Sequence, residues 1–249
     1  MKNKVAVITG GARMIGRATA AKLAQQGFDI LIHTGGKSIE DAKKTSKQIT
    51  DLSQKCEIVV GDLSELKTIN SIKEKANEMG DTLILINNAG MRIHEEFEKI
   101  KYDDWKKIMS VNIDAAFLCA QGLIGSMTKN SWGRIINIGG LSAHIGGRER
   151  AHVVTSKAAL IGLTKAISME FIERGITCNC VVPGFIEDFD TDKKNLEGHW
   201  LKHPQTPNLS TGRYGNPEDV AEVISNLCKK ESGYINGQVL HVNGGAYTP

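Results

Sequence analysis

The residues with the clearest chemical meaning form a glycine-rich turn near the start of the chain, Thr9-Gly10-Gly11-Ala12-Arg13-Met14-Ile15-Gly16. The turn follows an apolar run and leads directly into a segment with helical periodicity. Backbone N–H groups at the start of a helix, together with the helix dipole, bind phosphate groups. Glycines in a turn are a weak signal alone, but their position after the first expected strand strengthens it. The turn therefore predicts a site for a dinucleotide pyrophosphate.

Short apolar runs rich in valine and isoleucine must position this turn, and they alternate with longer segments of helical periodicity. Near-continuous apolar runs are typical of parallel strands that are buried on both faces. Strict alternation of strand and helix favours an α/β Rossmann fold, a doubly wound parallel sheet of about seven strands with helices on both faces. The expected strands are Val5–Thr9, Ile30–His33, Glu57–Val60, Leu83–Ile86, Arg134–Ile138, Thr177–Val182 and Gln238–Val242. The expected helices cover about 15–26, 39–53, 64–78, 103–127, 152–173 and 217–229.

The chain shows no sign of internal division. It has no repeat, low-complexity tract or Gly/Ser linker, so residues 1–249 are expected to form a single domain. The one long irregular stretch runs from Phe185 to Tyr214, directly after the sixth expected strand. Long loops in compact domains are usually functional. We therefore expect a substrate lid at about 185–214.

Composition excludes several classes of function. The 31 basic and 28 acidic residues give a net charge of +3 and are scattered, which argues against a nucleic-acid-binding face. A strand-like run begins within five residues of the start, and no apolar stretch reaches the ~18 residues of a membrane span. Five cysteines without regular spacing fit a reducing compartment, and Cys178 and Cys180 alternate as in a packed strand rather than a metal site. These observations predict a cytoplasmic protein with no metal site and no nucleic-acid or membrane partner.

Four further motifs follow the glycine-rich turn in the chain. They are Asn87-Asn88-Ala89-Gly90, Pro183-Gly184, the segment from Arg213 to Ala221, and the segment from Gly237 to Gly245. Together with the turn, they resemble the short-chain dehydrogenase/reductase family, and most of all its 3-oxoacyl-acyl-carrier-protein reductases. The resemblance covers the chain end to end. It implies an NAD(P)-dependent oxidoreductase that acts on a carbonyl or alcohol group of a small-molecule substrate.

The resemblance also implies which residues hold the cofactor. The turn would cradle the pyrophosphate, residues after the third strand would hold the adenine, the Asn-Asn-Ala-Gly motif would line the path to the ribose, and residues after the sixth strand would contact the nicotinamide. In that order they are Gly10, Ile15 and Gly16; Asp62 and Leu63; Asn88, Ala89 and Gly90; and Pro183, Gly184 and Ile186. The alternative is that Asp62 only caps the following helix and that the glycines only permit tight turns.

One residue of the turn departs from the family pattern. Met14 stands where the family has its second turn glycine, a position that normally has no side chain so that the backbone and the pyrophosphate can approach. The methionine side chain either points away from the pyrophosphate or blocks it.

The end of the second strand bears on cofactor choice. NAD-binding proteins of this fold place a carboxylate there, which accepts hydrogen bonds from the ribose hydroxyls. This chain has Thr34, then Gly35, Gly36 and Lys37, and Arg13 stands in the turn where a 2′-phosphate would lie. Charge-assisted hydrogen bonds from such cations to phosphate favour NADP(H) over NAD(H).

The catalytic set that the resemblance implies is incomplete. Family members use an Asn, a Ser, a Tyr and a Lys, with the Tyr four residues before the Lys. Asn112 matches the Asn, and Lys157 matches the Lys that also binds the ribose, but Val153 stands at the Tyr position and Gly140 at the Ser position. No tyrosine lies between residues 103 and 213, so no shift of alignment restores one. Losing both groups would cost on the order of 5–9 kcal/mol if their effects were additive.

Other side chains are candidates to replace the missing groups. Ser142 lies two residues past the expected serine, and His94, His144 and His152 are candidate proton donors because histidine titrates near neutrality. His152 is five residues from Lys157, about 140° around a helix, so it would face the substrate only if the helix began after it. Each histidine is otherwise an ordinary loop or interface residue. Arg148 and Arg150 are candidates for binding an acidic substrate.

Three functions remain open at this point. The first is an NADP-dependent oxidoreductase with an altered acid/base site, which the retained Asn112 and Lys157 favour. The second is a catalytically silent protein that binds NADP or a metabolite, which Gly140, Val153 and Met14 favour. The third is a non-redox reaction, such as an elimination or hydrolysis, in the same site. We expect a homotetramer or homodimer that pairs the helices at 103–127 and 152–173 through Ala115, Phe117, Leu118, Ala159, Leu160 and Leu163.

Overall fold

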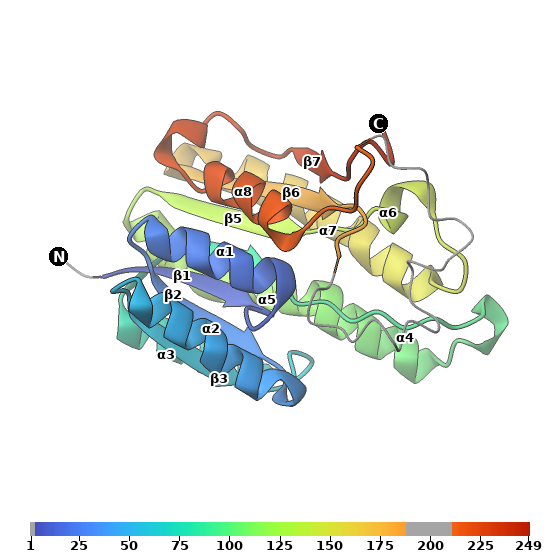
Figure 1. Ribbon diagram of the computed structural model, residues 1–249, viewed down its shortest axis with the longest axis horizontal. Coiled ribbons are helices and arrows are strands. Elements are labelled where there is room, and N and C mark those ends of the chain that lie inside the picture. The colour runs from blue at the N-terminus through green and yellow to red at the C-terminus, as the bar shows by residue number, and fades with distance from the viewer. Residues whose placement is uncertain (1–2, 188–210) are drawn as a thin grey trace.

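The computed structural model describes residues 3–187 and 211–249, and a single parallel sheet organises them (Figure 1). The strand order is β3-β2-β1-β4-β5-β6-β7, which confirms the predicted doubly wound Rossmann fold. The strands are β1 Lys4–Thr9, β2 Asp29–Thr34, β3 Cys56–Val60, β4 Asp81–Asn87, β5 Gly133–Ile138, β6 Ile176–Pro183 and β7 Val239–Val242.

Helices cover both faces of this sheet. On one face, α1, α2 and α8 lie in front of the sheet in Figure 1, and α3, α5 and α7 pack on the other. The main helices are α1 Met14–Gln25, α2 Ile39–Asp51, α3 Leu66–Met79, α4 Tyr102–Met109, α5 Ala115–Lys129, α6 Ser142–Ile145, α7 Ala151–Phe171 and α8 Pro217–Leu227. Short 3-10 turns span Gly36–Ser38, Phe97–Lys99, Ile172–Arg174 and Lys230–Ser232.

The apolar runs of the sequence form these strands because both faces of the sheet are buried. Along β1, Ile8 packs under α1 and α8, whereas the preceding Val7 packs under α3 and α5, and both are fully buried. Each such side chain contributes roughly 1.5–3 kcal/mol through burial. Cys178 and Cys180 are buried in β6 as packing residues, as their alternation predicts.

The expected helix at 103–127 is interrupted. Residues Ser110–Asp114 form a π-helical turn between α4 and α5, and buried Asn112 lies within it. The Asn112 side chain is hydrogen-bonded to the backbone of Met91, a long-range contact that local periodicity does not reveal. Helix α6 was not expected. Most of the expected lid, residues 188–210, lies outside the described residues.

The helical stretch Tyr102–Lys129 is long and apolar enough, by length and composition alone, to cross a membrane. This criterion averages hydropathy over a window, and the stretch includes Asp103, Lys107 and Asp114, so it differs from the uninterrupted apolar run that the sequence analysis looked for. Core helices of sheet proteins often meet the averaged criterion too, and α5 buries Ala115, Cys119 and Leu123 in the core beside β4.

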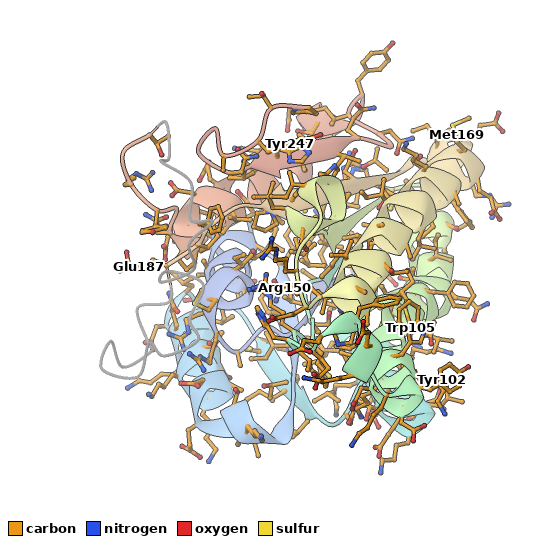
Figure 2. All side chains as sticks on the ribbon, turned by 90° about the vertical axis from the view of Figure 1, so that its right-hand side faces the viewer. Tyr102, Trp105, Arg150, Met169, Glu187 and Tyr247 are labelled. Carbon is orange, nitrogen blue, oxygen red and sulfur yellow. The ribbon has the colours of Figure 1, made fainter. Side chains whose placement is uncertain are left out.

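The sheet topology fixes where a ligand can bind. The connections after β1 and β4, which are neighbours, run to opposite sides of the sheet, and open α/β sheets bind ligands at the carboxyl ends of such strands. We call this side the carboxyl edge. Figure 2 looks onto it.

Candidate cofactor and active site

The glycine-rich turn fits closely against the loop that follows β4. Gly10 has a φ of 65°, and a Cβ there would lie 3.0 Å from the Ala89 Cα and 3.1 Å from its backbone nitrogen. A Cβ on Gly16 would overlap the Gly10 carbonyl oxygen. The Asn88 side chain donates to the carbonyl oxygens of Gly10, at 2.9 Å, and Thr9, at 3.2 Å. The backbone of the turn therefore packs directly against the loop after β4. Only glycine fits at positions 10 and 16.

Met14 does not project into this turn. Its side chain packs against the core cluster of α1 and borders a groove that Ala18, Ala21 and Pro217 also line, whereas buried Ile15 packs toward the sheet. Of the two possibilities that the sequence left open, the structure therefore has the methionine pointing away from the turn. Its backbone adopts a φ of 49°, in the left-handed region that favours glycine.

Cations gather at the end of β2, where the cofactor's adenosine ribose is expected. Arg13 Nε lies 3.7 Å from one Asp41 carboxylate oxygen, and Arg17 Nη2 lies 3.7 Å from the other. Thr34 is buried and donates to the Gly35 carbonyl, and Lys37 is exposed beside it. The sequence analysis missed Arg17 and Asp41, which lie farther along α1 and α2. Asp41 brings one carboxylate to a site that was expected to hold only cations.

A buried histidine that the sequence analysis also missed joins the turn to the third strand. The His33 Nδ1 atom accepts from the Gly10 N–H at 3.5 Å, and Nε2 lies 3.0 Å from the Gly61 carbonyl oxygen. A carbonyl can only accept, so Nε2 carries the proton. Burial lowers the pKa of His33, which is consistent with a neutral ring that serves as a structural link.

Asp62 is engaged within the protein itself. One carboxylate oxygen accepts from the Ser64 N–H at 2.9 Å and its hydroxyl at 2.8 Å, and the other pairs with Lys107. Hydrogen bonds from Lys107 and then from Ser64 lower the pKa of Asp62 to about 2. Asp62 thus shapes the turn before α3 without capping the helix, whose N-cap is Glu65, and it is also exposed at the carboxyl edge beside buried Leu63.

Lys157 and Asn112 come together with the Asn-Asn-Ala-Gly loop. The buried Lys157 Nζ donates to the Ile138 carbonyl oxygen at 2.6 Å. A Cβ on Gly90 would lie 3.4 Å from this Nζ atom and 3.7 Å from the Asn112 Oδ1. Burial, and then the charge of Arg92, lower the pKa of Lys157 to about 8. The lysine can therefore gain or lose a proton near neutral pH.

Asn112 holds these elements in place. Its Oδ1 accepts from the Met91 N–H at 2.7 Å, and its Nδ2 donates to the Met91 carbonyl at 3.1 Å and the Ser156 hydroxyl at 2.9 Å. Ser156, which the sequence analysis missed, donates in turn to the Val153 carbonyl. This network connects the loop after β4 to the first turns of α7.

The two positions that the sequence analysis aligned with the family's serine and tyrosine lie next to Lys157. Val153 is buried one turn before it on α7. A Cβ on Gly140 would lie 3.4 Å from Lys157 Cγ and 3.8 Å from the Ser142 hydroxyl oxygen. The half-buried Ser142 hydroxyl therefore lies beside the position where the family has a serine side chain.

The histidine candidates lie in different surroundings. Helix α7 begins at Ala151, before His152, so the condition for His152 to face the substrate is not met. Its ring is fully buried, and neither ring nitrogen has a hydrogen-bond partner in the described part of the chain. The His144 ring packs against His241, with ring centroids 4.5 Å apart, and against Tyr247. His94 is exposed on the loop after β4.

The loop after β6 completes the arrangement. The Gly184 N–H donates to the Val242 carbonyl at 2.9 Å, directly after buried Pro183. Ile186 is buried and forms a parallel bridge with Gly215. These contacts fix the residues that were predicted to lie near the nicotinamide. Among the residues described, no cluster of His, Cys, Asp and Glu could hold a metal ion.

Known proteins resemble this chain along its whole length. A family model described as enoyl-(acyl carrier protein) reductase matches residues 10–247. The 3-oxoacyl-acyl-carrier-protein reductase FabG of Aquifex aeolicus is 36% identical over 249 residues, which cover 99% of this chain and 98% of the relative. The corresponding reductase of Staphylococcus aureus is 34% identical over 247 residues, which cover 98% of each.

Solved structures of short-chain oxidoreductases are also similar to this chain. Acetoin dehydrogenase YohF from Salmonella typhimurium has a TM-score of 0.88 and 34% identity, and the match covers 98% of this chain and 95% of that one. A blue fluorescent protein from a metagenomic library, solved in complex with NADPH, has a TM-score of 0.89 and 30% identity, with 99% of both chains covered. The relatives are NAD(P)-dependent short-chain oxidoreductases, and the chain belongs to the short-chain dehydrogenase/reductase family.

Proposed function

We propose that this chain is an NADP(H)-dependent oxidoreductase that interconverts a carbonyl and an alcohol through an altered acid/base site. One observation carries the proposal: the Gly10–Gly16 turn and the Asn112–Lys157 pair converge on the same loop, residues 88–91, at the carboxyl edge. A dinucleotide seated in the turn would extend past this loop toward Lys157. When bound, the cofactor supplies or accepts the hydride.

The charges near the end of β2 support NADP(H) as the preferred cofactor. Arg13, Arg17 and Lys37 bring cations to this region, where Asp41 pairs with the two arginines, and Thr34 offers no carboxylate to a ribose hydroxyl. A 2′-phosphate would compete with Asp41 for the two arginines. Charge-assisted hydrogen bonds from arginine to phosphate are among the stronger ones that proteins make.

Lys157 is the best-supported proton donor in this altered site. With a pKa of about 8, it is mostly protonated at neutral pH and can still release a proton, as general acid catalysis requires. Ser142 is the candidate to orient the substrate oxygen, because its hydroxyl oxygen lies 3.8 Å from a Cβ on Gly140, beside the position that is aligned with the family serine. His144, which follows Ser142 in α6, and exposed His94 remain the histidine candidates, whereas fully buried His152 is withdrawn as a catalytic group.

The test follows NADPH oxidation with a panel of ketones and oxo acids. We expect turnover by the native chain, about 100-fold or greater loss in Lys157→Met, and a change of less than about twofold in Lys165→Met. Lys165 is the matched control because it is exposed on the same helix, two turns further on. Equal rates in the native chain and Lys157→Met would refute the role of Lys157. Dissociation constants for NADPH and NADH, measured by fluorescence, test the cofactor preference, and equal values would refute it.

The second candidate is a catalytically silent protein that binds NADP or a metabolite. Val153 and Gly140 favour it, because the two side chains that normally act on the carbonyl are both missing. Tight NADPH binding without turnover of any compound in the panel would support it. Elimination or hydrolysis in the same site would also leave NADPH unconsumed, and product analysis would detect either.

We further propose a cytoplasmic single-domain chain that assembles as a homotetramer or homodimer through α5 and α7. Phe117, Ala159 and Met169 are exposed on these helices, Phe117 at 44% and Met169 at 78%. Ala115 and Leu160 were expected at the contact, but both are buried within their own chain and are unavailable to a partner. Leu118 and Leu163 are half-buried. Light scattering at micromolar concentration tests the assembly, and a monomer would refute it.

A further inference from the structure

We propose that Arg92 and Arg150 bind a carboxylate group of the substrate, so that the chain reduces an oxo acid or oxidises the corresponding hydroxy acid. The inference rests on the proposed oxidoreductase function and specifies its substrate class. Arg92 lies two residues past Gly90, in the loop after β4, and Arg150 is the last residue before α7. The sequence analysis considered Arg148 and Arg150 for this role and missed Arg92. Arg148 is left out of the proposed site, because its charge is not among the causes of the pKa shifts of Lys157 and Arg150.

A backbone contact brings the two loops together. The Glu95 N–H donates to the Glu149 carbonyl oxygen at 2.8 Å, which ties the loop after β4 to the loop before α7. Figure 2 shows Arg150 in the middle of the carboxyl edge, facing the viewer. Arg92 is exposed and Arg150 is half-buried, so both residues have surface that a small molecule can contact.

The charges of these residues act on one another. The positive charge of Arg92 lowers the pKa of Lys157 and also that of Arg150, which places Arg92 within electrostatic reach of both. Protein atoms around the Arg92 guanidinium lower its own pKa by desolvation, although arginine remains protonated in proteins. Three cations therefore share one region of the carboxyl edge.

No side chain in the described part of the chain neutralises this cluster. Neither arginine forms an ion pair there, and the only acid with a charge effect on Arg150 is its exposed neighbour Glu149. Partly desolvated cations without a counter-ion are costly, and an incoming anion removes that cost. The planar guanidinium groups match the two oxygens of a carboxylate, so two parallel hydrogen bonds can form.

The position of the cluster determines which part of the substrate reacts. Lys157 Nζ lies beside Gly90, and Arg92 follows two residues later. A carboxylate held by Arg92 and Arg150 would leave a carbonyl one or two carbons away facing Lys157. In the reduction, the cofactor hydride would add to the carbonyl carbon and Lys157 would protonate the oxygen, which yields the hydroxy acid and NADP⁺.

A matched control lies on the same loop. Arg148 is exposed, and its charge is not among the causes of the pKa shifts of Lys157 and Arg150. The experiment compares acetoacetate with its neutral methyl ester as substrates, in the native chain and in Arg92→Gln, Arg150→Gln and Arg148→Gln. The measured quantity is the ratio of kcat/KM for the acid to that for the ester. Effects of Arg92 on the pKa of Lys157 act on both substrates and cancel in this ratio.

We expect the native chain to prefer the acid by at least about tenfold, as charged hydrogen bonds typically provide. Arg92→Gln and Arg150→Gln should each reduce the preference about tenfold, and Arg148→Gln should leave it unchanged within about twofold. A native chain that reduces both substrates equally well would overturn the proposal. So would a preference that survives both substitutions.

A binding measurement separates this proposal from the proposed function. Malonate cannot be reduced, and its binding to the NADPH-loaded protein can be followed by calorimetry with inorganic phosphate as the comparison anion. Malonate binding that Arg92→Gln abolishes supports the carboxylate site even if no substrate is turned over. Turnover of the neutral ester without malonate binding supports the oxidoreductase and overturns the carboxylate site. Tighter binding of phosphate than of malonate also overturns the assignment of a carboxylate.

Discussion

The two ends of the proposed site are constrained in different ways. At the cofactor end, Gly10 and Gly16 press against backbone atoms of the turn and of Ala89, so packing dictates which residues fit. At the proton-transfer end, Gly140 has room for a Cβ, and Val153 fills the tyrosine position as an ordinary buried apolar residue. Steric exclusion therefore determines which residues fit at the cofactor end. At the proton-transfer end packing permits other side chains, and only the need for a proton donor would select among them. The altered acid/base site that we propose is therefore compatible with an intact cofactor turn.

Restoring the missing groups is the strongest test of this contrast. Gly140→Ser combined with Val153→Tyr should raise the reduction of neutral 3-oxoacyl or diketone substrates by about 100-fold, since general acid catalysis typically contributes ~10²–10⁴. The serine should fit, because a Cβ on Gly140 meets no atom closer than 3.4 Å. Lys157, four residues past the new tyrosine, would lower its pKa by charge.

Stopped-flow absorbance of NADPH measures this gain, with Gly140→Ser alone as the matched control. A double variant that binds NADPH and stays inert on every carbonyl would contradict the view that only the acid is missing. It would instead support the silent binding protein.

The charge of Lys157 should also be visible in stability. Its pKa is about 8 in the folded chain and ordinarily 10.5, so the folded state binds fewer protons than the unfolded state between these values. The free energy of unfolding therefore rises with pH through this window because of Lys157, and below pH 8 the full cost of the buried charge is present, on the order of 3 kcal/mol. Lys157→Met removes that cost and loses a hydrogen bond to Ile138 worth about 1 kcal/mol.

We expect Lys157→Met to be more stable than the native chain by about 2 kcal/mol at pH 7, and this advantage to fall as the pH rises and to change sign near about pH 10, where only the lost hydrogen bond remains. Urea unfolding of both proteins across this range measures it. Burial raises the pKa of Cys56 to about 11, an effect that both proteins share, whereas the charge of Lys157 lowers the pKa of Cys180, so the difference isolates the lysine below about pH 9, where the thiols are protonated. A difference that does not change with pH would show that Lys157 is not desolvated.

Sequence reasoning located the strands within about two residues, because burial on both faces leaves a near-continuous apolar signal. It did not foresee the π-helical turn that contains Asn112, whose side chain accepts a hydrogen bond from Met91, a long-range contact that local periodicity does not encode. Arg92 was missed for a related reason. It belongs to an irregular loop, and only the contact between Glu95 and Glu149 places it near Arg150.

The packing constraint at the cofactor end can be tested directly. Gly16→Ala should destabilise the chain by about 1–3 kcal/mol and weaken NADPH binding at least tenfold, because its Cβ would overlap the Gly10 carbonyl. Gly36→Ala is the matched control, since a Cβ there meets open space. Thermal unfolding and NADPH fluorescence measure the two effects. If Gly16→Ala behaves like Gly36→Ala, steric exclusion does not define this end of the site.

The smallest expected effect concerns Met14, where the two kinds of constraint meet. Its left-handed backbone costs about 1 kcal/mol in any residue with a Cβ, whereas its side chain packs on the outer face of α1. Met14→Gly removes both the strain and the packing, and Met14→Ala removes only the packing. We therefore expect the glycine variant to be about 1 kcal/mol more stable than the alanine variant by urea unfolding. NADPH affinity should change less than about threefold in both, because the methionine points away from the turn. NADPH binding that is tenfold tighter in Met14→Gly alone would mean that the methionine side chain obstructs the pyrophosphate. The cofactor end would then differ from the family pattern in function, as we propose for the proton-transfer end.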